Sequence, residues 1–170
     1  MAIEKLENYV AVEKRIDLIR DKYALEEGYI SSSEEASPWV PFMPNTWIRH
    51  LLFDVRNNYA VNILKVAAGG SLGRHRHRAQ VTGYVLKGSW KYVEYDWIAT
   101  PGDYIRESPG RTHTLVSDHG METIFHLGLP LEFLDENDRL IETVDVFWFI
   151  DHYLNYCKEN NIPVNEKLFV

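Results

Sequence analysis

Two histidines alternate with three arginines at the end of the glycine-rich stretch Gly69-Gly70-Ser71-Leu72-Gly73-Arg74-His75-Arg76-His77-Arg78. In an extended strand alternate side chains share a face, so His75 and His77 point one way while the arginines point the other. A third histidine closes the segment Pro109-Gly110-Arg111-Thr112-His113. Imidazoles from two strands can occupy one face of a metal's coordination sphere, so the three histidines predict a metal site. The alternative is a set of surface histidines in a basic strand.

Composition limits the classes of protein to which the chain can belong. Its 170 residues are enough for one domain with a real core, and a net charge of −7 argues against a general nucleic-acid binder. Cys157 is the only cysteine, which excludes a disulfide framework and a thiolate metal site. The start lacks a secretory signal, and no apolar stretch approaches membrane-spanning length. We therefore expect a cytoplasmic protein that binds neither membranes nor nucleic acid.

The middle of the chain has the pattern of an antiparallel β-protein. Short runs of Val, Ile, Tyr, Trp and Thr are separated by turn residues such as Asn57-Asn58, Gly88-Ser89 and Pro101-Gly102. Regularly punctuated short strands indicate a sandwich or barrel. Strands are expected at 47–55, 59–67, 74–78, 82–87, 90–95, 103–107, 112–117, 122–129 and 139–142.

Apolar residues at the spacing of an amphipathic helix occur only near the two ends of the chain. Apolar side chains among charged ones predict an amphipathic helix, or two short ones, over 2–26, followed by a polar connector at 31–38. A second helix is expected from about 144 to 160, with the apolar face Val146, Phe149, Ile150, Tyr153 and Cys157. The predicted division is an arm and linker at 1–37, a barrel at 38–143, and a C-terminal helix and tail at 144–170. We expect the arm and the proline-rich segment after the connector to form a homodimer.

The histidine stretch resembles the first motif of the cupin superfamily, in which a glycine precedes His-x-His and a second glycine follows. Gly69, His75, His77 and Gly88 match that motif, and Gly102, Pro109-Gly110 and His113 resemble the second motif. The resemblance implies an all-β, single-domain cupin, a double-stranded β-helix or jelly-roll barrel with an N-terminal helical arm and a C-terminal helix. It also implies that His113 completes a metal site with His75 and His77.

The motifs depart from the cupin pattern at one chemically important position. The glutamate that serves many cupins as a fourth ligand falls at about Val81, where no carboxylate is present. The resemblance then implies either a three-histidine site or a degenerate cupin that no longer binds metal.

More narrowly, four segments resemble the cupins that act as 2,4'-dihydroxyacetophenone dioxygenases, alongside the three-histidine diketone-cleaving cupins. They are Trp39-Val40-Pro41, His75-Arg76-His77, the run from Gly83 to Trp90 with Tyr92, Glu94 and Asp96-Trp97 after it, and the run from Glu107 to Leu115. This likeness implies a non-haem Fe(II) enzyme that cleaves a carbon–carbon bond of a small ketone with O2. Zn, Ni, Mn and Co stay open, because imidazole ligands alone do not select the metal.

Several further residues are candidates for the site. Val81 and Gly83 are expected to leave room for a ligand, and Trp90 and Tyr92 to line the pocket. A catalytic or metal-supporting role is considered for Glu107, Glu94 and His126. For Glu107 the alternative is an exposed carboxylate at a strand end, and for His126 it is a hydrogen-bonded core histidine.

The expected function is thus an Fe(II) dioxygenase acting on a hydroxyketone or diketone. Two alternatives stay open: another metal-dependent cupin enzyme, such as a lyase or isomerase, and a ligand-sensing cupin without turnover. We interpret Cys157 as a core residue. The remaining histidines, His50, His119 and His152, are interpreted as surface or structural.

Overall fold

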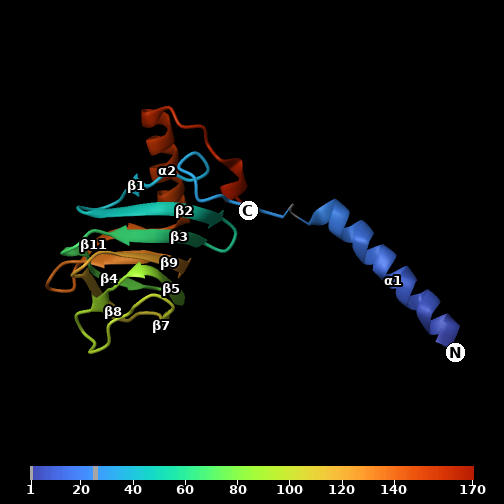
Figure 1. The fold of residues 1–170 in the computed structure, drawn as a ribbon, viewed down its shortest axis with the longest axis horizontal. Coiled ribbons are helices and arrows are strands. Elements are labelled where there is room, and N and C mark those ends of the chain that lie inside the picture. Colours follow the sequence, from blue (N-terminus) through green and yellow to red (C-terminus); the bar gives the residue numbers. More distant parts are fainter. Residues whose placement is uncertain (1, 25–26) are drawn as a thin grey trace.

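Two antiparallel β-sheets lie face to face in the structure, a computed structural model that describes residues 2–24 and 27–170 (Figure 1). The six-stranded sheet contains, in spatial order, β1 (Val40–Pro41), β2 (Thr46–Asp54), β3 (Tyr59–Val66), β9 (Met121–Gly128), β5 (Val81–Gly88) and β7 (Tyr104–Glu107). The five-stranded sheet contains β11 (Leu140–Val144), β10 (Leu131–Leu134), β4 (Gly70–His77), β8 (Thr112–Ser117) and β6 (Lys91–Tyr92). The predicted all-β cupin architecture is confirmed.

The side chains that alternate toward the space between the sheets form the core. In β8 and β9 buried and less buried residues alternate strictly over most of the strand, as expected where one face of a sheet is covered. The buried set includes Phe53, Leu64, Trp90, Leu115 and Phe125. This core holds the inner faces of β4 and β8 away from water.

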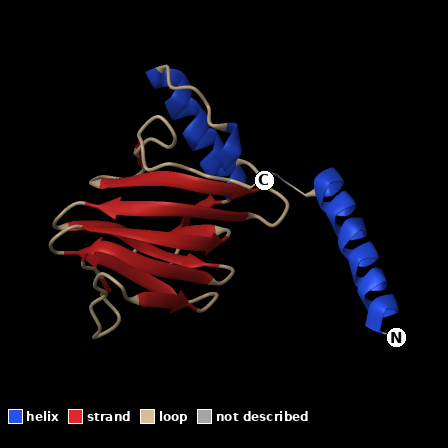
Figure 2. Ribbon diagram, turned by 45° about the vertical axis from the view of Figure 1, so that its right-hand side comes forward, coloured by secondary structure: helices blue, strands red, loops and turns tan. Residues whose placement is uncertain are grey.

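Helix α2 (Val146–Asn160) covers one end of the sandwich beside β2 (Figures 1 and 2). The Asp145 side chain caps its start by accepting a hydrogen bond from the Trp148 backbone N–H, and Asn161 ends it in the left-handed conformation. Its buried residues are Val146, Phe149, Tyr153 and Cys157. The prediction that Cys157 packs in the core is therefore confirmed. A short 3₁₀ helix, Glu166–Leu168, follows.

Helix α1 (Ala2–Tyr23) stands apart from the sheets in Figures 1 and 2. Tyr9, Val12, Ile16, Ile19 and Tyr23 are all exposed, so no part of the described chain covers this apolar set. No helix in residues 2–24 and 27–170 is both long enough and apolar enough to cross a membrane.

Four strands differ clearly from the sequence-based expectation. Strand β4 begins at Gly70, four residues before the expected start, and β1 was not among the expected strands. The strand expected at 90–95 is cut to β6, because residues 93–96 turn away after Tyr92. Strand β10 was not predicted; it pairs with β4 and β11 and so completes the second sheet.

Candidate metal centre

Three histidines converge on the inner face of the five-stranded sheet. His75 and His77 lie two residues apart on β4, and His113 of β8 is the direct cross-strand partner of His75. The possible ligand atoms of the three side chains all lie within 4.8 Å of one another, and all three residues are buried. The pleat of β4 and the register of β4 with β8 therefore bring the predicted residues together.

The orientation of His75 is fixed by a backbone contact. Its Nδ1 lies 2.9 Å from the carbonyl oxygen of Gly73 and donates a hydrogen bond to it. Gly73 has a φ of +83° and lies at an irregularity of the β4–β8 ladder, which turns its carbonyl group toward the ring. The Nε2 atom of His75 is left with its lone pair free for a metal.

Burial also sets the charge of the imidazoles. It lowers the pKa of His75 to about 3 and that of His77 to about 4, and neighbouring imidazoles add to the effect. Both rings are therefore neutral at pH 7. Neutral imidazole is the form that binds a metal ion.

A carboxylate completes this group from the opposite sheet. Glu107 ends β7, where it pairs directly with Val81 of β5, and it is only 6% exposed. Its Oε2 atom lies 3.3 Å from His113 Nε2 and 3.6 Å from His77 Nε2. The Tyr92 hydroxyl donates a 2.5 Å hydrogen bond to Oε1. The burial of Glu107 excludes the alternative of an exposed carboxylate at a strand end.

The surroundings keep this carboxylate ionised. Burial alone would raise the pKa of Glu107, but the contacts with His113, His77 and Tyr92 outweigh it and lower the pKa to about 2. The pKa of Tyr92 is raised well above its usual value by burial and by the charge of Glu107. The site therefore pairs a carboxylate with a phenol that keeps its proton.

The donor set fits a divalent cation. Within the described residues, His113 Nε2 and Glu107 Oε2 are buried and have no hydrogen-bond partner of adequate geometry. Orphaned nitrogen and oxygen atoms that converge in an apolar interior are costly unless a ligand or ion satisfies them. Three imidazoles with an adjacent carboxylate suit Fe, Zn, Ni, Mn or Co.

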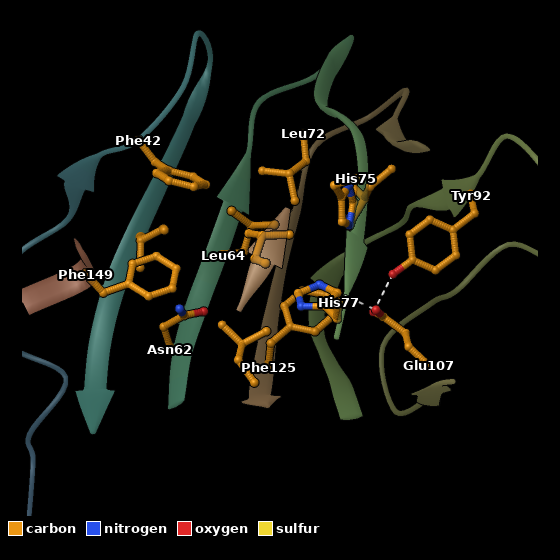
Figure 3. A pocket seen from close by; sticks show the side chains of 14 residues that line it. Phe42, Asn62, Leu64, Leu72, His75, His77, Tyr92, Glu107, Phe125 and Phe149 are labelled. Atoms are coloured by element: carbon orange, nitrogen blue, oxygen red, sulfur yellow. Dashed lines mark hydrogen bonds and ion pairs between the residues drawn. The ribbon is translucent and has the colours of Figure 1, made fainter. Parts of the chain in front are cut away.

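Two of the histidines, His75 and His77, line a largely apolar cavity of about 30 Å³ (Figure 3). Its polar groups are His75, His77, Tyr92 and Glu107 at one end and Asn62 at the other. The apolar lining comprises Phe42, Ile48, Leu64, Leu72, Leu115, Phe125, Leu127, Leu131 and Phe149. This volume holds one or two water molecules, so a larger ligand requires the lining side chains to move.

Two of the candidate acid–base residues lie away from the cavity. Glu94 follows the end of β6, and its carboxylate accepts hydrogen bonds from the Thr114 backbone N–H and hydroxyl instead of facing inward. His126 is exposed on β9 and lies 2.8 Å from the Tyr59 hydroxyl. The structure thus places neither residue at the histidines, because the chain turns before Glu94 and the pleat of β9 directs His126 outward.

The predicted open space beside Val81 and Gly83 is absent. Val81 is fully buried, and a Cβ atom on Gly83 would lie 2.8 Å from the Phe125 ring. Phe125 therefore fills the space beside Gly83. Trp90 is buried against Tyr92 and Phe125 but does not line the cavity, whereas Tyr92 does.

Sequence reasoning missed Asn62, Phe42 and Phe149 as cavity residues. A signal for Asn62 was present, because it is the one amide in the otherwise mainly apolar strand Tyr59–Val66. Phe42 and Phe149 come from outside the main barrel strands, so no local pattern marks them.

The geometry agrees with the comparisons to known proteins. A sequence profile of the ChrR cupin-like domain matches residues 28–132. The chain belongs to the ChrR cupin-like family. The match covers both histidine segments, from β4 to β8, and Glu107 between them.

Solved structures show the same fold. An RmlC-like cupin protein from Ralstonia eutropha JMP134 is 28% identical with a TM-score of 0.79, over 85% of this chain and 95% of that one. Acetylacetone dioxygenase from Acinetobacter johnsonii is 20% identical with a TM-score of 0.71, over 77% of this chain and 93% of that one. No curated protein sequence matches the chain significantly.

Proposed function

We propose that this ChrR-family cupin is an Fe(II)-dependent dioxygenase that cleaves a carbon–carbon bond in a small hydroxyketone or diketone. The observation that carries the proposal is the buried cluster of three imidazoles beside an ionised carboxylate, at one end of an apolar cavity. The shared fold with acetylacetone dioxygenase, a protein named for a diketone, supports the same reaction class.

His75, His77 and His113 would hold the metal. When bound, ferrous iron supplies the redox chemistry that O2 requires and polarises the oxygens of a chelating ketone. An imidazole ligand carries no charge when it binds a metal ion, so among these groups only Glu107 offsets the charge of a divalent ion, and a net positive charge remains. An anionic enolate is therefore the form of the ketone that the site favours.

Glu107 is the residue placed to form that enolate. Its carboxylate lies within 3.6 Å of His77 and His113, so a ketone carbon held at the histidines comes within its reach. Glu107 accepts the proton from this carbon, and the electron pair of the C–H bond moves into the enolate. Tyr92 holds the carboxylate in place through its hydroxyl group. The apolar lining excludes water from the reacting carbon.

Anaerobic titration tests the proposal. Protein loaded with Fe(II) is mixed with 2-hydroxyacetophenones and β-diketones, and an optical change is expected when the ketone binds. Addition of O2 should then consume one O2 per ketone and give two carboxylic acids from a 2-hydroxyacetophenone, or one carboxylic acid and one 2-oxoaldehyde from a β-diketone. Binding of the ketones without O2 uptake would contradict the dioxygenase and point to a sensor or to another cupin enzyme.

Metal content separates the enzymatic alternatives. Protein purified without added metal is analysed for Fe, Zn, Ni, Mn and Co, and each metal is then tested for reconstitution of activity. Activity restored by Zn or Ni alone, without O2 uptake, would indicate a lyase or isomerase. The His113→Ala variant serves as the control that lacks one ligand.

A further inference from the structure

The aromatic residues around the three histidines differ in type between the two sides of the site. The cavity is lined by three phenylalanines, Phe42, Phe125 and Phe149, whose rings resist oxidation, and by the single tyrosine Tyr92. In Figure 3 Tyr92 lies on the side of the histidines away from Phe42 and Phe149. Its aromatic neighbours outside the cavity are rings that lose an electron far more readily, those of Trp90, Tyr95 and Trp97.

Tyr92 is in direct contact with the proposed metal centre. Its ring stacks on that of His113, with 3.8 Å between the ring centroids and 14° between the ring planes. Its hydroxyl group donates a hydrogen bond to Glu107 Oε1. A phenol that loses an electron also gives up its proton, and this carboxylate is already in place to accept it. Tyr92 therefore combines contact with a proposed metal ligand and a proton acceptor.

Trp97 connects Tyr92 to the surface. The two rings meet edge to face, with 5.5 Å between their centroids. Trp97 also stacks on Tyr95, with 5.7 Å between the centroids. Trp97 and Tyr95 are 40% and 41% exposed, whereas Tyr92 is only 1% exposed. Oxidisable rings in contact thus extend from a buried histidine to solvent.

Trp90 indicates that packing alone does not set the ring types in this cluster. It is buried, and its ring contacts those of Tyr92 and Trp97 at centroid distances of 5.1 and 5.7 Å. Within the described residues, its Nε1–H group has no hydrogen-bond partner. A buried donor without a partner costs free energy that a phenylalanine at this position would avoid. The cost points to a use of the indole other than packing.

We propose that Tyr92 and Trp97 form a redox relay that passes one electron from a small thiol in solution to the metal centre when hydrogen peroxide reaches it. The inference rests on the proposed function, because it takes Fe(II) to be held by the three histidines. The relay spares these histidines, since an oxidising equivalent that is not removed attacks the side chains that touch the metal.

The electrons and protons of the relay balance. Hydrogen peroxide takes two electrons, one from the ferrous ion and one from Tyr92, and two protons from solvent to give two waters. The Tyr92 proton passes to Glu107 Oε1, which leaves a neutral tyrosyl radical. Trp97 then gives an electron to Tyr92, which recovers its proton from Glu107, while the Trp97 indole N–H releases a proton to solvent. A thiol returns a hydrogen atom to Trp97, and two thiyl radicals combine to a disulfide.

Freeze-quench electron paramagnetic resonance tests the relay without ketone or turnover. Fe(II)-loaded protein is mixed with one equivalent of hydrogen peroxide, and the wild type should give a tyrosyl radical signal. Tyr92→Phe should lose this signal. Mass spectrometry of the same samples should then show more oxygen added to the peptides that carry His75, His77 and His113.

Tyr153→Phe is the matched control for the tyrosine. Tyr153 is as deeply buried as Tyr92 but packs against His50 and Phe53, so this variant should keep the signal and the wild-type level of histidine oxidation.

Trp97→Phe tests the exit to solvent. Trp97 does not line the cavity, so this variant should bind Fe(II) as the wild type does and form the Tyr92 radical. In the presence of glutathione that radical should decay more slowly than in the wild type. Trp39→Phe removes an indole that packs against Arg49 and Lys65, and it should leave the decay unchanged.

Metal analysis before mixing shows which proteins hold Fe(II). An iron-loaded wild type without a tyrosyl radical, or an unchanged signal in Tyr92→Phe, would overturn the relay. If Tyr92→Phe does not retain iron, the comparison of Trp97→Phe with the wild type decides, and equal decay rates would refute the relay. A radical that depends on Tyr92 and Trp97 would sustain it even if no ketone caused O2 uptake, a result that refutes only the dioxygenase. A wild type that binds no iron would overturn both.

Discussion

Glu107 stands directly across from Val81, the position at which many cupins carry a liganding glutamate. The carboxylate is thus present at the histidines, but it comes from β7 instead of β5 and ends 3.3 Å from His113. A hydrogen bond from Tyr92 holds it there. Glu107 thus lies outside the motif that carries His75 and His77, which agrees with its proposed role as the base rather than as a metal ligand.

Glu107→Gln should lower kcat/KM for ketone cleavage by about 10²-fold or more, because an amide cannot accept the proton. The three histidines remain, so metal content should stay close to that of the wild type. Steady-state O2 uptake and metal analysis of the same preparation measure the two effects.

Glu94→Gln is the matched control for this prediction. Its carboxylate contacts Thr114 and Arg74 on the surface, and the variant should retain activity within about twofold. If the two substitutions reduced activity equally, the assignment of the base to Glu107 would be wrong.

His50 should make the protein sensitive to acid. Burial, with a smaller effect of His152, lowers the pKa of His50 to about 3 in the folded state, against about 6.5 in the unfolded chain. Between these values only the unfolded chain binds the proton, so stability is complete above about pH 6.5 and is lost as the pH falls toward 3. His50→Phe should flatten this loss by up to about 1.4 kcal/mol per pH unit.

Urea denaturation from pH 7 to pH 4 measures this slope. His119→Gln removes an exposed histidine and should leave the slope unchanged. An identical pH dependence in wild type and His50→Phe would show that His50 does not contribute.

At the scale of the strand, alternation was the most informative signal in the sequence. It predicted that His75 and His77 share a face, and it placed the strand over 112–117 with the bounds that β8 has. The proximity of His113 to His75 did not follow from spacing alone; it came from the family resemblance and depends on the β4–β8 register.

Contacts between distant segments determine the two features of the site that the sequence did not predict, the closure of the cavity and the position of Glu94. The cavity is closed by Phe42 and by Phe149 of α2, whose positions depend on how distant segments dock. The role considered for Glu94 assumed that a strand continues past Tyr92, but the chain turns there. Neither the docking of these segments nor the turn after Tyr92 can be derived from local strand propensity.

Gly88, at the point where the chain leaves β5 of one sheet for β6 of the other, should not tolerate a side chain. Gly88 ends β5 with a φ of +67°, and an added Cβ atom would overlap the carbonyl oxygen of Gly120. Gly88→Ala should therefore destabilise the fold by at least about 3 kcal/mol. Gly102 has a φ of +94° but open space around it, so Gly102→Ala should cost only about 1 to 2 kcal/mol. Thermal melts of both variants measure the difference, and equal losses would contradict the steric argument.

For the whole molecule, metal binding should act as a stabilising ligand. A free metal concentration 1,000-fold above Kd contributes about 4 kcal/mol, which raises Tm by about 10 °C for a domain of this size. Differential scanning fluorimetry with and without metal, and after chelation, should show this shift. His113→Ala should show little of it. A wild-type Tm that no metal changes would indicate a degenerate cupin.

We expect the full chain to be a homodimer. Helix α1 exposes Tyr9, Val12, Ile16, Ile19 and Tyr23, an apolar set that association would cover. The double substitution Ile16→Glu and Ile19→Glu should then give a monomer in light scattering, whereas Lys14→Glu should not. A monomeric wild type would refute the expectation.

The position of β7 at the edge of its sheet has a kinetic consequence. This strand pairs with β5 alone, whereas β9 is paired on both sides. Edge segments detach at lower free energy than strands held by two neighbours. The cavity of about 30 Å³ is too small to admit a ketone without such a movement. The strand that carries Glu107 is thus expected to detach more readily than the central strands, and its movement would couple substrate entry to the withdrawal of Glu107 from the histidines.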